Sequence, residues 1–267
     1  MKKTVRCLVP CLVLLFLYIP ILVLAFYSFT DASQIGTFTS FSLKNYSTLF
    51  TKEELRSMIS GTILLALGSA LLATILGTLG AIGSFYSKKR TTSAMATVNQ
   101  IPVINADVVT GFSLCVLLVV VFGVSKDTYI PLVIGHVTLC APFVYLSVIP
   151  KLKQMDPSLY EAALDLGARP RTALIRVVLP QLLSGVISGF SLAITLSLDD
   201  YFIATYTKPA TFDTISTYVV NATKGSHTEI KTALWALSTV IFLLVILLVV
   251  VMNLKASHEE KKGEKAV

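Results

Sequence analysis

Long apolar runs separated by short polar segments dominate the hydropathy pattern of this chain. Most runs reach about 20 residues, the length that an α-helix needs to cross the hydrocarbon core of a bilayer. Lipid offers the backbone no hydrogen-bond partners, so these runs have to be helical. The pattern predicts six membrane-spanning helices, with the third interrupted by Asp107, at about 7–28, 59–85, 95–122, 129–149, 183–206 and 231–254.

Composition supports a membrane protein. The 267 residues are 54% hydrophobic and 14% charged, and their mean hydropathy is +0.77. An ordinary soluble domain carries roughly a quarter charged residues, so a typical cytosolic enzyme, a disordered regulator and a disulfide scaffold are excluded. We expect one all-α integral membrane domain over residues 1–267. The four cysteines lie inside apolar runs and show no spacing typical of a metal site.

The net charge of +7 is explained by membrane topology rather than by nucleic-acid binding. Most lysines and arginines lie in the segments that would be inside if the N-terminus is cytoplasmic. The positive-inside rule therefore predicts both termini in the cytoplasm, in a cell membrane crossed several times. Residues 150–183 then form the longest inner loop, 255–267 form a short cytoplasmic tail, and 28–58 and 207–230 lie outside.

The loop 150–183 has the pattern of two short helices. Asp156 is a good N-cap, and Pro157 suits the first helical position. Gly167 predicts a helix stop, and a second helix is expected from about Pro170 to Val178, ending before Pro180. The first helix has an apolar face, which its own helix ends or a partner has to cover; it consists of Leu159, Ala162, Ala163 and Leu166.

The same loop resembles the EAA loop of ATP-binding-cassette importer permeases, because Glu161-Ala162-Ala163 is followed four residues later by Gly167 and then by Leu179-Pro180. The resemblance implies a type I (MetI-like) bundle in which this short cytoplasmic helix couples to an ATPase. Glu161, Ala162, Ala163 and Gly167 would form the contact. The implied partners are a second homologous permease, an ATPase dimer and an extracellular substrate-binding protein.

ATP and Mg²⁺ would then bind to the partner ATPase. This chain has no GxxxxGK[ST] motif for phosphate binding and no plausible catalytic cluster, so we expect a transport subunit rather than an enzyme, with no cofactor of its own.

Two further stretches, Ala106-Asp107-Val108-Val109 and Ser197-Leu198-Asp199-Asp200-Tyr201-Phe202, resemble the permeases of polyamine importers. That resemblance implies spermidine or putrescine as cargo. The family pattern has proline before the aspartate, where this chain has Ala106. Pro102 is then the candidate source of the local kink.

Asp107, Asp199 and Asp200 are also unusual on physical grounds. An aspartate at the centre of a spanning helix costs about 2.5–3.5 kcal/mol on insertion scales, so such residues usually face the bundle interior or a water-filled path. Together with Tyr201 they are our candidate pathway residues, suited to a polycation. Adjacent residues diverge by about 100° on a helix, so Asp199 and Asp200 cannot both face one path unless the helix is broken. Helix capping, contact with a partner or pairing with Lys208 are the alternatives.

Several hypotheses stay open at this point. The importer could carry another small solute, such as an amino acid, a sugar or an ion, or the chain could be a secondary transporter or channel. His136 is expected to be a hydrogen-bonded packing residue rather than a proton relay. A stripe of small residues predicts either internal helix packing or a dimer face; it consists of Ser69, Ala73, Gly77 and Ala81.

Overall fold

The computed structural model describes residues 2–31, 40–156, 158–224, 233–243 and 246. These residues are mainly helical, and the only β-pairing among them is one isolated bridge between Thr30 and Phe41. The chain divides into two compact units, residues 1–56 with 219–267, and residues 57–218. That both belong to one permease domain stays a prediction.

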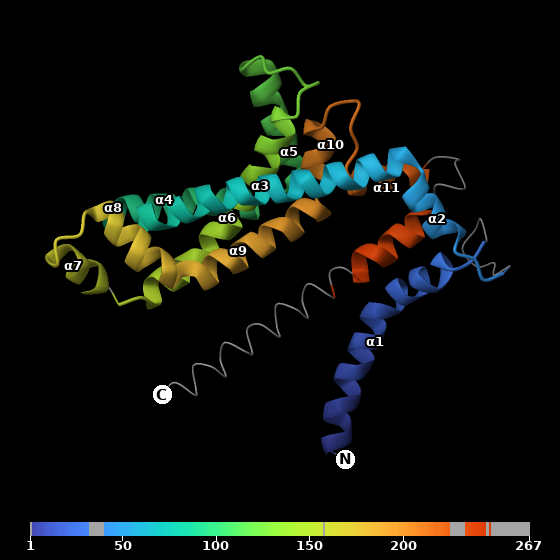
Figure 1. The fold of residues 1–267 in the computed structure, drawn as a ribbon, viewed down its shortest axis with the longest axis horizontal. Coiled ribbons are helices and arrows are strands. Elements are labelled where there is room, and N and C mark those ends of the chain that lie inside the picture. Colours follow the sequence, from blue (N-terminus) through green and yellow to red (C-terminus); the bar gives the residue numbers. More distant parts are fainter. Residues whose placement is uncertain (1, 32–39, 157, 225–232, 244–245, 247–267) are drawn as a thin grey trace. The chain divides into compact units, whose positions relative to one another are not determined.

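The first unit contains α1 (Lys2–Ser28) and α2 (Lys44–Thr51), shown in Figure 1. From Leu8 onward α1 is apolar on all sides and mostly exposed, as a helix surrounded by lipid would be. The Asn45 side chain donates to the carbonyl oxygens of Ser28 and Thr30, at 3.0 and 2.9 Å, and so satisfies the end of α1. An apolar helix also covers Ala233–Leu243. Half of the predicted span 231–254 and the whole tail 255–267 lie outside the described residues.

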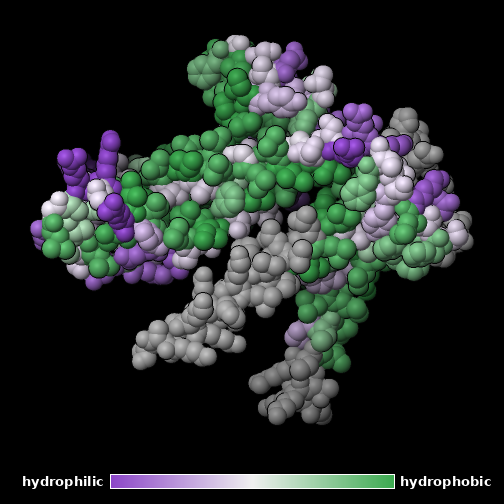
Figure 2. Space-filling view, in the orientation of Figure 1, coloured by the Kyte–Doolittle hydropathy of each residue, from purple (hydrophilic) through white to green (hydrophobic). Residues whose placement is uncertain are grey.

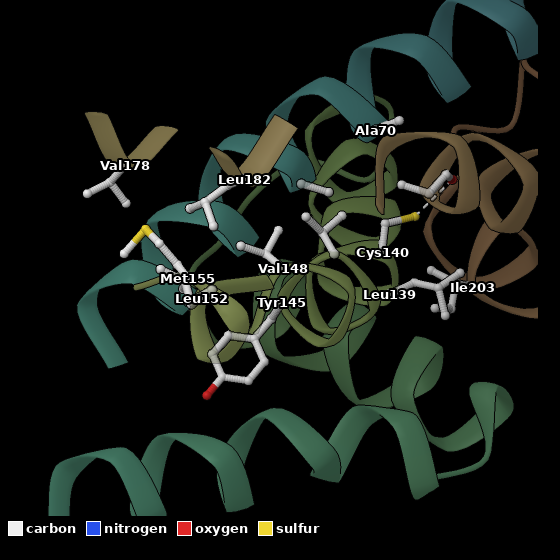
Figure 3. Close-up of a cluster of buried hydrophobic side chains, with 14 residues drawn as sticks. Ala70, Leu139, Cys140, Tyr145, Val148, Leu152, Met155, Val178, Leu182 and Ile203 are labelled. Carbon is white, nitrogen blue, oxygen red and sulfur yellow. Dashed lines mark hydrogen bonds between the residues drawn. The ribbon is translucent and has the colours of Figure 1, made fainter. Parts of the chain in front are cut away.

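The second unit is built around α6 (Ile130–Gln154), which packs along α9 (Leu179–Asp199). The helix α3 (Glu53–Phe85) approaches α6 closely, since a Cβ at Gly77 would lie 2.7 Å from the Cβ of Val144. All four members of the small-residue stripe are buried, so its interpretation as internal packing is confirmed. Figure 3 shows the buried cluster around α6, where the Cys140 thiol donates to the Ala193 carbonyl at 3.3 Å.

The prediction of one helix over 95–122 is wrong. Two helices, α4 (Lys89–Ile104) and α5 (Asp107–Cys115), meet at 103°, and a π-helical stretch from Val116 to Val121 continues α5. The backbone is extended at Asn105 and Ala106. Pro102 lies in the last turn of α4, where it removes one amide donor. Asp107 opens α5, where a carboxylate interacts favourably with the positive end of the helix dipole.

The prediction of a helix over 183–206 is also wrong at its end. The helix α9 stops at Asp199, and a separate helix, α10 (Phe202–Thr207), follows. The reason is the side chain of Asp200, which accepts hydrogen bonds from the backbone at the start of α10. Aspartate competes with the backbone in this way and favours helix ends over helix interiors.

The loop 150–183 is largely as predicted at its start. The helix α7 covers Ser158–Asp165, and the Asp156 carboxylate accepts the backbone N–H of Ser158 at 2.9 Å, which confirms the N-cap. That hydrogen bond holds the pKa of Asp156 below its usual value, so the cap is charged at neutral pH. Gly167 has a φ of +83°, which confirms the helix stop. Pro157 itself lies outside the described residues.

The predicted end before Pro180 is wrong. Helix α8 (Pro170–Ala173) passes into a π-helical turn, Leu174–Val178, which continues without interruption into α9. Proline lacks the amide hydrogen of an ordinary α-helical turn, and its ring crowds the carbonyl four residues earlier. The wider π turn just before Pro180 accommodates both effects, so the chain stays helical.

Among the described residues, four helices are long and apolar enough to cross a membrane, or five if the bent α4–α5 pair is one span. The four are Leu8–Ser28, Glu53–Phe85, Ile130–Gln154 and Pro170–Asp199. Hydrophilic residues of the second unit gather at the end that carries α7 and α8, and hydrophobic residues cover the helices beyond it (Figure 2). A membrane-embedded helical protein is therefore supported, and the predicted number of six spans stays a prediction.

Candidate functional site

The two helix breaks face each other. The helix α5, which begins after the first break, packs against α10, which begins after the second. A Cβ at Gly111 of α5 would lie only 2.9 Å from the Cα of Ile203 in α10, so the backbones are nearly in contact. Asp107 and Asp199 both lie within electrostatic range of Asp200. Asp107 lies more than ninety positions before the adjacent pair Asp199 and Asp200, and the packing of α5 on α10 brings the three aspartates into one acidic cluster.

Within this acidic cluster Asp200 is buried and hydrogen-bonded. Only 8% of the residue is exposed, and its carboxylate accepts the backbone N–H groups of Ile203 at 3.2 Å and Ala204 at 2.8 Å. Its side chain thus caps the start of α10 from the position before the N-cap residue, which is Tyr201. Lys208 does not pair with it, because the Lys208 ammonium lies 3.0 Å from Asp213 and donates to the Phe212 carbonyl at 2.9 Å.

A histidine completes the buried side of the cluster. The side chain of His136, in the first third of α6, is fully buried, and its Nδ1 lies 2.8 Å from the hydroxyl of Ser197. Its Nε2 lies 3.6 Å from an oxygen of Asp200. The expected hydrogen bond of a packing histidine is confirmed. Sequence reasoning missed its proximity to Asp200, for which the only signal was two ionisable side chains in two apolar runs.

Asp107 and Asp199 differ from Asp200 because both are exposed. No ion pair joins either of them to another residue in the described ranges. Because α9 ends between these adjacent aspartates, they take different environments: Asp199 is exposed and Asp200 is buried. Two unpaired carboxylates at exposed helix breaks are suited to attract a cation.

Aromatic rings lie close to the same breaks. Tyr201, a candidate pathway residue, is half-buried, and its ring centre lies 5.2 Å from that of Phe202. The rings of Phe112 in α5 and Tyr206 in α10 are 5.8 Å apart. Aromatic faces can hold an ammonium group or a methylene chain. Over the part of the chain that the structure describes, no group of three or more histidine, cysteine and acidic side chains is arranged to hold a metal.

The helix α7 has the opposite character, and Figure 1 shows it at one end of the second unit. Its inner face is held by Tyr160, which packs on the buried cluster and contacts the ring of Tyr86 at 5.0 Å. Ala163 lies on the half-buried side. Its outer face, with Glu161 and Ala162, is exposed, and so is Leu166 in the turn directly after α7, which is 89% exposed. Of the predicted coupling residues, Glu161, Ala162 and the exposed Gly167 are therefore accessible to a partner.

Comparisons with a family model and with related proteins agree on one family. Residues 1–258 match the family described as binding-protein-dependent transport system inner membrane component. The putrescine transport system permease protein PotI of Escherichia coli (strain K12) is 32% identical over 232 residues, which cover 85% of this chain and 81% of that protein. The spermidine/putrescine transport system permease protein PotC of Haemophilus influenzae is 32% identical over 243 residues, which cover 91% and 94%.

Solved structures share the fold. A bacterial ABC transporter involved in the import of the acidic polysaccharide alginate matches with a TM-score of 0.70 and 14% identity, over 93% of this chain and 95% of that one. The alginate transporter in complex with its alginate pentasaccharide-bound periplasmic protein matches with a TM-score of 0.72 and 19% identity, over 92% of each chain. At these identities the comparison shows that the helical arrangement of ABC importer permeases is present.

Proposed function

The chain belongs to the family of binding-protein-dependent transport system inner membrane components, and we propose that it is the permease subunit of an ATP-driven importer of polyamines, spermidine or putrescine. The acidic cluster carries the proposal, because it joins carboxylates from two separate helix breaks and leaves two of them exposed. The transport of putrescine or spermidine by PotI and PotC supports the same cargo.

The breaks themselves support a pathway at this place. Non-helical backbone at membrane depth is tolerated where it is enclosed by protein or lines a water-filled cavity, and broken helices often form the binding sites of transporters. A polyamine carries several ammonium groups along an apolar chain. Asp107 and Asp199 would lower the cost of removing water from these groups, Tyr201 would offer an aromatic face, and Asp200 would keep α10 in place.

The outer face of α7 supports coupling to an ATPase. Leu166 and Ala162 form an exposed apolar surface beside the charge of Glu161, and no described residue covers it. An exposed apolar surface of this kind is typical of a protein–protein contact. In the proposed assembly the ATPase dimer contacts α7 around the Gly167 turn and binds ATP and Mg²⁺ itself. ATP binding and hydrolysis then drive alternating access of the cargo pathway to the two sides of the membrane. A second homologous permease forms the other half, and an extracellular binding protein delivers the cargo.

This assembly requires α7 and both chain termini to lie in the cytoplasm. The distribution of lysine and arginine supports that orientation. Labelling of a single cysteine placed at the exposed Leu166 by a membrane-impermeant thiol reagent, in cells that produce the permease without the ATPase, would test it. We expect labelling in inside-out vesicles and none in intact cells, and the reverse result would contradict both the orientation and the ATPase contact.

Uptake of labelled spermidine, putrescine and phosphate tests the cargo in cells that contain the complete transporter. We expect uptake of a polyamine and none of phosphate, because an acidic pathway repels an anion. Uptake of phosphate or an amino acid without uptake of a polyamine would contradict the proposal and favour an importer for another small solute.

The substitution Asp107→Asn tests the pathway within the same assay. Loss of one exposed carboxylate should raise the half-saturating polyamine concentration about tenfold, which corresponds to about 1.4 kcal/mol. Asp127→Asn is the matched control, because it removes the same charge from an exposed loop position before α6. Equal kinetics of the two variants would remove Asp107 from the pathway.

A further inference from the structure

The imidazole of His136 bridges the break between α9 and α10. Its Nδ1 lies 2.8 Å from the hydroxyl of Ser197, in the last turns of α9. Its Nε2 lies 3.6 Å from the carboxylate of Asp200, which caps α10. One side chain of α6 thus contacts both sides of the break.

The hydrogen-bonding roles follow from the chemistry of the two neighbours. A carboxylate can only accept, so the favourable neutral imidazole carries its hydrogen on Nε2, toward Asp200. Nδ1 is then the acceptor for the Ser197 hydroxyl. Among the described residues Nε2 has no partner at ordinary hydrogen-bond distance, although the side chain is fully buried. The neighbouring acceptor that can satisfy it is Asp200, after an approach of about half an ångström.

The backbone around His136 places α10 firmly on α6. A Cβ at Gly135 would lie 2.6 Å from the Cγ2 of Ile203 and 3.4 Å from the hydroxyl of Thr207. Ile203 is also the residue that approaches Gly111 of α5. The helix α10 therefore packs closely against both α5 and α6. A shift of α10 would change the distance between the two helix breaks.

We propose that His136 is a positioning residue for transport: it holds the carboxylate of Asp200 on the start of α10, and thereby keeps the exposed Asp107 and Asp199 in register for the cargo. The statement about cargo rests on the proposed function. His136 does not touch the cargo itself, because its side chain is buried behind Asp200.

Two substitutions separate the two nitrogens of the imidazole. In His136→Gln the amide nitrogen reaches the place of Nε2 and can donate to Asp200. In His136→Asn the amide reaches only the place of Nδ1, so the contact with Ser197 is kept and the contact with Asp200 is lost. Both variants are assayed for polyamine uptake in the complete transporter, together with Asp200→Asn and the double variant His136→Asn/Asp200→Asn.

We expect the half-saturating polyamine concentration to rise less than about threefold in His136→Gln and about tenfold in His136→Asn, with the amount of assembled transporter unchanged. The double variant should be no worse than Asp200→Asn, because the two side chains act as one unit. Equal half-saturation in the Gln and Asn variants, additive effects in the double variant, or a loss confined to the amount of protein would each overturn the proposal.

Hydrogen–deuterium exchange of the assembled transporter tests the positioning without any cargo. The amides of Ile203 and Ala204, which Asp200 caps, should exchange at least about threefold faster in His136→Asn than in His136→Gln. Equal exchange in both variants would overturn the positioning role even if polyamines are carried. Faster exchange in a transporter that carries no polyamine would support the positioning role and contradict only the proposed cargo.

Discussion

The α7 helix and the break between α9 and α10 differ in how far the chain itself buries and hydrogen-bonds their side chains. At the break the key carboxylate is buried and accepts two backbone hydrogen bonds, and a buried histidine lies behind it. On α7 the outer face is exposed, and Leu166 in the turn after it is almost completely accessible. The first arrangement is enclosed by this chain, whereas the second is open to a partner. Substitutions at the break should therefore alter stability, and substitutions on the outer face of α7 should alter assembly alone.

The largest expected effect is on assembly. Leu166→Glu should reduce co-purification of the ATPase and polyamine uptake by at least about tenfold, because it puts a charge in an apolar contact. The free energy of unfolding of this variant should stay within about 0.5 kcal/mol of the parent value, since the Leu166 side chain is exposed. Gln154→Glu is the matched control, because it adds the same charge at an exposed position at the end of α6. A full yield of ATPase with Leu166→Glu would show that this face of α7 is not the contact.

The break should show the opposite result. Asp200→Ala removes the side chain that caps α10 and the acceptor beside His136, and should lower the free energy of unfolding by about 2 kcal/mol. That corresponds to a Tm about 4–8 °C lower in detergent. Asp199→Ala changes the adjacent exposed residue and should leave Tm nearly unchanged. Equal Tm values for the two variants would contradict the claim that the buried Asp200 stabilises the fold and the exposed Asp199 does not.

The smallest expected effect concerns the glycine after α7. Gly167→Ala places a Cβ at a φ of +83°, and should destabilise the turn by about 1 kcal/mol. Gly83→Ala is the control, because it lies inside α3 and its Cβ would meet no described atom within 4 Å. Alanine favours the helix there by about 0.5–1 kcal/mol. Thermal unfolding should therefore shift down in the first variant and up in the second, and a shift in the same direction would contradict the φ-based explanation.

Local rules predicted the α7 region well because its signals lie within a few residues of one another. Asp156 caps the amide of Ser158, two positions away, and Gly167 closes the same helix. The hydropathy pattern likewise predicted where the long apolar helices lie. It failed inside the third run, where α4 and α5 meet, and at the end of α9. An apolar run does not show where the backbone turns, or where a polar side chain such as Asp200 takes over backbone hydrogen bonds.

From the sequence alone follow the membrane as solvent, the approximate positions of the apolar helices and the exposed EAA-like turn, since each depends on composition or on neighbours along the chain. Only the tertiary structure decided that Asp107 comes close to Asp200, that Asp199 and Asp200 point apart, and that His136 lies behind them. These relations depend on how α5, α6 and α10 pack, and the closest approaches occur where Gly111 and Gly135 provide no side chain. Contacts between residues so far apart in the chain arise from packing rather than from any local preference.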